Sequence, residues 1–208
     1  MSRGDLLRSL FRAGADRAAR RLEGSGPVAR VRRALSQLRD QRATLDERTL
    51  TRLVAHVPGA ASASVNARSG RLLVDLTFRD GEHRAFGLTP LAARFAPRGA
   101  KEIVLRVTPR ELLAERALRQ TVSAIAGAVA HSLWAVAMPD ARPEDLIGAI
   151  VDRDGSECVR VDLRSVPAVR EALRQRSGAL VVELLELREL RVEDGALALQ
   201  LRLAGLLG

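Results

Sequence analysis

The chain has 208 residues, of which 47% are hydrophobic and only 2% aromatic, so its core must be built from leucine, valine and alanine. Its single cysteine, Cys158, excludes an internal disulfide and a cysteine-rich metal site. Of the 34 basic residues, 33 are arginine and one, Lys101, is lysine, and the formal net charge is +9.

Most of this positive charge lies near the N-terminus. Residues 1–43 contain 11 arginines against four acidic residues, a net charge of +7, which leaves +2 for the remaining 165 residues. We therefore expect a basic arm, residues 1–43, attached to a nearly neutral α+β body, residues 44–208. Such an arm indicates an anionic partner, which is either a lipid surface or nucleic acid. The first residues lack the uninterrupted apolar stretch of a secretory signal, so we expect a cytoplasmic location, with contact at the inner face of the membrane.

The arm is predicted to form two basic helices separated by GSGP at residues 24–27. Each has an apolar face and an arginine-rich remainder, so it can lie in the headgroup layer of an anionic membrane. The same pattern also fits a solvated helix face that packs on the body. The predicted membrane or anion surface consists of Leu6, Leu7, Arg8, Leu10, Phe11, Arg12, Arg17, Arg20, Arg21, Arg30, Arg32 and Arg33, with Phe95 from a later loop.

A third helix is predicted from Thr44, where TLDE forms a capping box, to residue 57. The pattern then changes to alternating apolar and polar residues, which predicts strands over residues 61–68, 71–79 and 82–89. Asp80-Gly81 marks a hairpin turn, because both residue types tolerate the positive φ of a tight turn. A loop over residues 90–100 leads to a fourth strand, residues 101–107. This antiparallel meander has one apolar face that needs a cover.

The cover is predicted to be one long helix, residues 109–138, which begins at the capping box TPRE with Pro109 as its first residue and ends before Pro139. Its second half, TVSAIAGAVAHSLWAVAM, carries no formal charge and could be a membrane span, a core helix or a site around His131. Its many small residues favour a helix that is enclosed by sheets. Strands over 147–153 and 157–164, a short helix over 166–175, a bulged strand over 180–192 and a strand over 196–203 are predicted to follow.

The predicted fold is therefore α+β, with curved antiparallel sheets packed on a long central helix and preceded by basic N-terminal helices. Residues 60–138 supply the meander and the long helix, and residues 139–208 supply strands and a short helix.

No pattern of catalytic or metal-binding residues stands out in the sequence. The three histidines, His56, His83 and His131, lie in separate elements without the spacing of metal ligands. Asp152-Arg153-Asp154-Gly155 starts like a calcium loop, but its glycine comes too early, so we interpret it as a hairpin turn. No nucleophile elbow or phosphate-binding glycine loop is present. We expect no enzymatic activity, no metal and no cofactor.

The order of elements over residues 60–208 resembles the tubular lipid-binding superfamily. The resemblance rests on RLLVDLTFRDG, EHRAF, KEIVLRVTP, the helix that reaches Met138, and RVEDGALALQLRL. It implies an apolar groove between helix and sheet that holds acyl chains. The residues that would line this groove, and that would otherwise be plain core, are Leu72, Val74, Leu76, Phe78, Ile125, Val129 and Trp134.

The function we expect is a non-enzymatic lipid-binding or peripheral membrane-associated module, whose partner is an anionic membrane lipid or an acyl-chain ligand. The first alternative is a cytoplasmic adaptor whose arm docks on an acidic protein partner. The second is a basic protein that associates with nucleic acid, although Phe11 is the only aromatic residue of the arm that could stack on bases.

Overall fold

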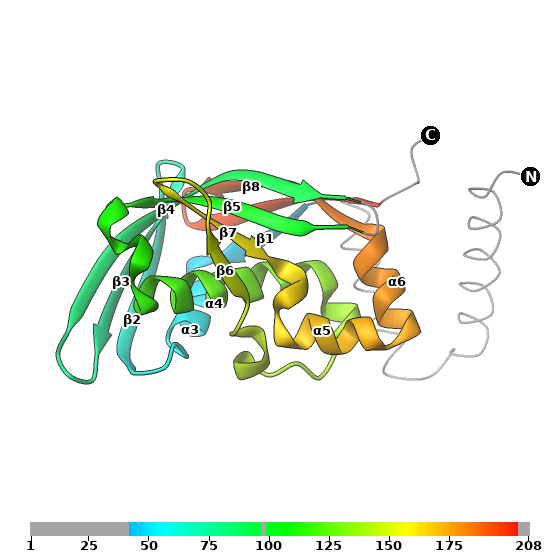
Figure 1. Ribbon diagram of the computed structural model, residues 1–208, viewed down its shortest axis with the longest axis horizontal. Helices are drawn as coiled ribbons and strands as arrows, with labels where there is room; N and C mark the ends of the chain where they lie inside the picture. Colours follow the sequence, from blue (N-terminus) through cyan, green and yellow to red (C-terminus); the bar gives the residue numbers. More distant parts are fainter. Residues whose placement is uncertain (1–41, 97–98, 204–208) are drawn as a thin grey trace, which may run out of the picture.

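The computed structural model describes residues 42–96 and 99–203, which form two antiparallel sheets with helices packed beneath them (Figure 1). The predicted α+β class with antiparallel strands is thus confirmed. The twelve arm residues predicted to bind a membrane, from Leu6 to Arg33, lie outside the described residues.

The described part begins with a strand where the sequence pattern predicts a helix. Strand β1 (Arg42–Asp46) pairs with the last strand of the chain, and helix α3 (Glu47–Val54) follows without a loop. The predicted helix start at Thr44 is therefore wrong. The N-cap is Asp46, whose carboxylate accepts a hydrogen bond from the Thr49 amide at 2.8 Å. This bond lowers the pKa of the Asp46 carboxyl.

The predicted meander is present as β2 (Ala60–Arg68), β3 (Arg71–Phe78), β4 (His83–Phe95) and β5 (Lys101–Thr108), each antiparallel to the next. The loop predicted over residues 90–100 is mostly wrong, because β4 continues to Phe95. A register shift between Pro90 and Ala92 lets the pairing with β5 resume. The proline and the alanines of this segment favour a loop in the sequence pattern. Pro90 has no backbone N–H to donate to the neighbouring strand, and the bulge accommodates this loss.

The helix predicted over residues 109–138 is divided into three segments. They are the 3-10 helix η1 (Arg110–Ala114), helix α4 (Arg116–Trp134) and the 3-10 helix η2 (Ala135–Ala137). The first break lies at Glu115, whose backbone is extended with φ −74 and ψ 138. Helix α4 thus has 19 residues and is shorter than the helix that the sequence predicts.

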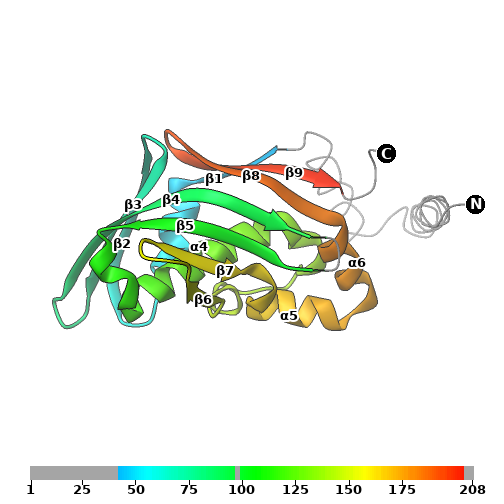
Figure 2. The ribbon, with the colours of Figure 1, turned by 45° about the horizontal axis from the view of Figure 1, so that its top comes forward.

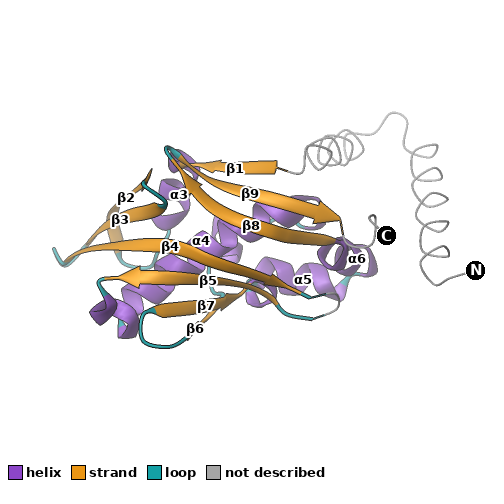
Figure 3. Ribbon diagram, turned by 90° about the horizontal axis from the view of Figure 1, so that it is seen from above, coloured by secondary structure: helices purple, strands orange, loops and turns teal. Residues whose placement is uncertain are grey.

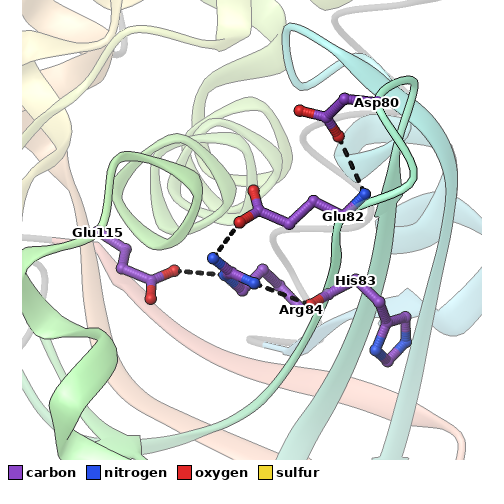
Figure 4. A network of polar contacts seen from close by, with 5 residues as sticks. All are labelled: Asp80, Glu82, His83, Arg84 and Glu115. Carbon is purple, nitrogen blue, oxygen red and sulfur yellow. Dashed lines mark hydrogen bonds and ion pairs between the residues drawn. The ribbon is translucent and has the colours of Figure 1, made fainter.

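The break at Glu115 is tied to the β3–β4 hairpin by Arg84. The Arg84 Nε donates to the Glu115 carboxylate at 2.8 Å, while the same guanidinium pairs with Glu82 (Figure 4). The Glu82 amide in turn donates to Asp80 at 3.0 Å. Hydrogen bonding to Glu115 raises the pKa of Arg84. The hydrogen bond from Arg84 thus holds Glu115 next to strand β4, immediately before α4 begins.

The second half of the chain adds strands to both sheets. It contains η3 (Pro143–Leu146), β6 (Ile150–Arg153), β7 (Cys158–Asp162), η4 (Leu163–Ser165), α5 (Pro167–Arg174), α6 (Arg176–Leu184), β8 (Leu185–Glu193) and β9 (Ala196–Leu203). The strand predicted over residues 180–192 is wrong in its first part, since the chain stays helical to residue 184. The irregular pattern of apolar residues over 180–192 has two causes. The chain passes from helix α6 to strand β8 at Leu185, and the pairing of β8 with β9 shifts in register between Leu187 and Glu189.

The strands form a six-stranded sheet of order β2-β3-β4-β5-β7-β6 and a three-stranded sheet of order β1-β9-β8. Figures 2 and 3 both show β8 beside β4, although no strand pairing joins these two within the described residues. At one end the sheets are linked, because the Gly195 amide donates to the Ala67 carbonyl at 3.0 Å. The β4–β8 boundary is thus a seam between two sheets.

Helix α4 lies under these sheets and carries the centre of the core. Every residue from Thr121 to Ala130 is buried, and the helix touches α3, β1, β6, β7 and β8. A β-carbon added at Gly127 would lie 1.9 Å from the Leu146 carbonyl oxygen, so glycine is required for this close approach. Within the described residues, no helix is long and apolar enough to cross a membrane.

Candidate functional site

The residues predicted to line an apolar groove are packed as core. Leu72, Val74, Leu76, Ile125, Val129 and Trp134 are each at most 2% exposed, and half-buried Phe78 packs against the same cluster. They come from β3 and α4, so the sequence pattern places them on inward faces. An acyl chain that entered this region would therefore have to displace existing side-chain contacts.

Phe95, predicted as a membrane contact, lies at the end of β4 and packs inward. It is half-buried against the core, and its ring centroid is 6.2 Å from that of Trp134 with the planes tilted by 37°. This offset arrangement is a favourable one for two aromatic rings. Phe95 and Trp134 thus form an aromatic pair between the β4–β5 hairpin and the end of α4.

Lys101, the only lysine of the chain, lies beside this aromatic pair. Its side chain is 0% exposed, and its Nζ donates to the Ala96 carbonyl at 2.8 Å. The same nitrogen lies 5.7 Å from the centroid of the Phe95 ring, within the range of a cation–π contact. Burial lowers the pKa of Lys101, although the carboxylates of Glu183 and Glu186 oppose this effect. A buried amine of this kind is costly unless it is paired.

The pairing comes from α6, β8 and η4. Glu183 lies 3.8 Å from Lys101 and 3.8 Å from Arg164, so it bridges the two cations. Arg164 also donates to the Gly99 carbonyl at 3.0 Å, which fixes the turn between β4 and β5. Glu186 is 3% exposed, and its negative charge, like that of Glu183, favours the protonated form of Lys101. We call Lys101, Arg164, Glu183 and Glu186 the buried ion cluster; Lys101 and Glu186 are buried in it, and Arg164 and Glu183 are half-buried.

The buried ion cluster joins elements of both sheets. Lys101 belongs to β5 of the six-stranded sheet, whereas Glu186 belongs to β8 of the three-stranded sheet. Because no strand pairing crosses the β4–β8 seam in the described residues, these charges link the sheets at this end. The arrangement explains why charged residues are retained inside an apolar core.

Two buried nitrogen atoms on the last turn of α4 have no hydrogen-bond partner within the described structure. They are the Nδ1 of His131 and the Nε1 of Trp134. Trp134 is 0% exposed, while His131 is half-buried, and burial lowers the pKa of the imidazole. Buried polar atoms are usually paired. The indole Nε1 can only donate and therefore lacks an acceptor, whereas Nδ1 donates or accepts according to the tautomer of the imidazole.

The other polar features are satisfied by their neighbours. A pocket of about 320 Å³ lies on the three-stranded sheet, but Arg42 in it pairs with Glu193 at 2.6 Å and Arg191 with Glu189 at 2.5 Å. Across residues 42–96 and 99–203, no three His, Cys, Asp or Glu side chains gather as metal ligands. The end of α4 with the buried ion cluster is therefore the strongest candidate site.

Comparison with protein-family models, with curated proteins and with solved structures finds no match to this chain. The site must therefore be interpreted from its own chemistry. Composition alone contained one signal for it, since a single lysine among 33 arginines suggests a position where arginine does not fit. Glu183, Glu186 and Arg164 carry no such signal, because each looks like an ordinary surface charge.

Proposed function

We propose that the chain is a non-enzymatic lipid-binding module that associates peripherally with anionic membranes. The observation that carries the proposal is the end of α4, where a helix buried among apolar side chains presents polar atoms that no described residue satisfies. An apolar helix beneath antiparallel sheets offers an acyl chain a surface of alanine, valine and leucine. The donors at its end offer a place for the polar part of the same molecule.

Entry of a chain would use the β4–β8 seam. Opening this seam at the end near Lys101 breaks no strand pairing among the described residues, whereas the hydrogen bond from Gly195 to Ala67 can keep the sheets joined at the other end. Burying one methylene of a lipid chain contributes about 0.8 kcal/mol, so a ten-carbon chain contributes about 8 kcal/mol. That gain is large enough to offset the separation of several core contacts.

The arm supplies the membrane contact in this proposal. Each basic residue near an anionic surface contributes about 1 kcal/mol, and residues 1–43 have a net charge of +7. Membrane attachment would thus come from the arm, and lipid specificity from the body. Because the arm contribution is electrostatic, it must weaken as salt concentration rises.

Vesicle flotation tests the membrane role with the full chain. We expect binding to vesicles that contain phosphatidylglycerol but not to pure phosphatidylcholine vesicles. A variant with the eight arm arginines replaced by glutamine should lose binding: Arg8, Arg12, Arg17, Arg20, Arg21, Arg30, Arg32 and Arg33. The matched control replaces eight exposed arginines of the body and should keep it: Arg71, Arg79, Arg106, Arg110, Arg142, Arg153, Arg170 and Arg174.

Other outcomes of the same experiment separate the alternatives. Equal loss in both variants would refute a specific role of the arm. Binding to duplex DNA but not to vesicles would favour the nucleic-acid function. Binding to neither would leave the adaptor that docks on an acidic protein. Native mass spectrometry of the purified chain tests the carrier role, because a chain that never retains a lipid argues against it.

A further inference from the structure

The two unpartnered nitrogen atoms lie on one turn of α4. His131 and Trp134 are three residues apart, which places their side chains next to each other on the helix surface. The indole Nε1 can only donate a hydrogen bond, so it requires an acceptor. Both atoms are shielded from solvent and have no partner among the described residues. The structure therefore holds a donor for which it supplies no acceptor.

The surroundings limit what the acceptor can be. Burial lowers the pKa of His131, so the imidazole is uncharged near neutral pH and brings no positive charge to the pair. Lys101, a buried cation that lies 5.7 Å from the centroid of the Phe95 ring, already donates to Ala96 at 2.8 Å and faces Glu183 at 3.8 Å. A carboxylate or phosphate placed beside Trp134 would thus be desolvated without a free counter-charge. An uncharged oxygen is the acceptor that fits.

We propose that the indole N–H of Trp134 donates a hydrogen bond to the ester carbonyl of an acyl lipid, whose chain runs along α4. This inference rests on the proposed lipid-binding function and names the chemical group that the site selects. Buried apolar residues flank the pair on the same helix, among them Val129, Ala130 and Leu133, and Phe95 packs on the indole ring. The phosphate or other headgroup stays outside, so selection is for the acyl ester linkage.

The sole tryptophan makes the site directly observable. Trp134 is the only tryptophan of the chain, so the indole N–H gives one resonance in a ¹⁵N-correlated NMR spectrum. The probe is dihexanoyl-phosphatidylcholine below its micelle concentration. The control is the dihexyl ether analogue, which keeps the chains and headgroup but lacks both carbonyls. We expect the ester lipid to bind about tenfold more tightly, the effect of one net hydrogen bond. Only the ester lipid should move the indole N–H resonance downfield.

Two variants test the assignment by calorimetry. Trp134→Phe keeps an aromatic ring beside Phe95 but removes the donor, so the ester-to-ether affinity ratio should fall from about ten to about one. Ser132→Ala, on the same turn, should leave the ratio unchanged. If Trp134→Phe fails to fold, the wild-type resonance still decides the question.

The outcomes distinguish this inference from the function on which it rests. Equal binding of both lipids without movement of the indole resonance overturns the carbonyl site and leaves lipid binding intact. Binding of neither lipid overturns the lipid-binding function and the carbonyl site together. An indole N–H that contacts only a long-lived water, and keeps that contact when the ester lipid is added, also overturns the carbonyl site.

Discussion

Replacement of Gly127 by alanine tests the packing of α4 most directly. The added β-carbon would lie 1.9 Å from the Leu146 carbonyl oxygen and 2.7 Å from its carbon, well inside van der Waals contact. Both neighbours are backbone atoms, so a simple rotation of a side chain cannot relieve the overlap. Either α4 or the segment after η3 must move away.

The expected loss of stability follows from the contacts beside this overlap. Ser123, one turn earlier on α4, accepts hydrogen bonds from the Gly148 and Ala149 amides at 2.7 Å each. Separating the two segments weakens both bonds, at about 1 kcal/mol each, and disturbs packing by about 1–3 kcal/mol. Alanine returns about 1 kcal/mol through its better helix propensity. The net destabilisation is about 2–4 kcal/mol.

Urea unfolding followed by far-UV circular dichroism and by Trp134 fluorescence measures this change. The matched control is Gly87→Ala in β4, where the added β-carbon meets nothing closer than 3.8 Å and should shift the free energy of unfolding by less than about 0.5 kcal/mol. A Gly127→Ala variant as stable as the wild type would refute the close approach of α4 to Leu146. Equal destabilisation of both variants would show that the effect is not specific to this contact.

Two further substitutions and one digestion experiment test other parts of the core. Ser123→Ala removes the acceptor of the amides of exposed Gly148 and half-buried Ala149, so the free energy of unfolding should fall by about 1–2 kcal/mol in urea, and an unchanged value would contradict these bonds. Burial lowers the pKa of His131 below 6.5, so the unfolded chain binds a proton first as pH falls, and stability is lost from about pH 6.5 down through the folded pKa. His131→Gln should flatten that part of the stability–pH profile, and an identical slope in both proteins would count against a buried imidazole. Endoproteinase Lys-C can cut this chain only after Lys101, whose side chain is 0% exposed, so the native protein should resist it until urea unfolds the core; rapid cutting without denaturant would refute this burial.

The parts of the fold that the sequence predicts are those set by local signals. Alternating apolar residues mark β2, β3 and β5, and the turns at Gly81, Gly155 and Gly195 have φ of 87, 82 and 84, the conformation that glycine favours. These features depend only on neighbours in the chain. A sequence pattern is therefore sufficient to place them.

The errors lie where distant contacts override local preference. Strand β1 forms because Thr44 pairs with Ala198, a partner more than 150 residues away that no local pattern reveals. Val181 and Val182 favour a strand by propensity, yet they lie in α6. Gly178 allows this helix to approach α5 closely, since a β-carbon there would lie 2.2 Å from the Ala172 carbonyl oxygen. Tertiary packing decides the structure of this segment.

The candidate site was hidden from the sequence for a related reason. Its charged members come from β5, η4, α6 and β8, and none follows a motif. The long apolar stretch around His131 indicated a buried helix, but only the structure shows that two of its nitrogen atoms lack partners. The last turn of α4 thus keeps polar groups inside the core.

The contacts around position 101 explain why lysine, and not arginine, occupies it. An arginine there would bring a planar guanidinium with five N–H donors into a site whose contacts are the Ala96 carbonyl at 2.8 Å and the Glu183 carboxylate at 3.8 Å. It could not lose its proton, whereas burial already lowers the pKa of the lysine amine. Glu183 also lies 3.8 Å from Arg164, so the two cations share this carboxylate. Lysine therefore fits this position between the two sheets better than arginine does.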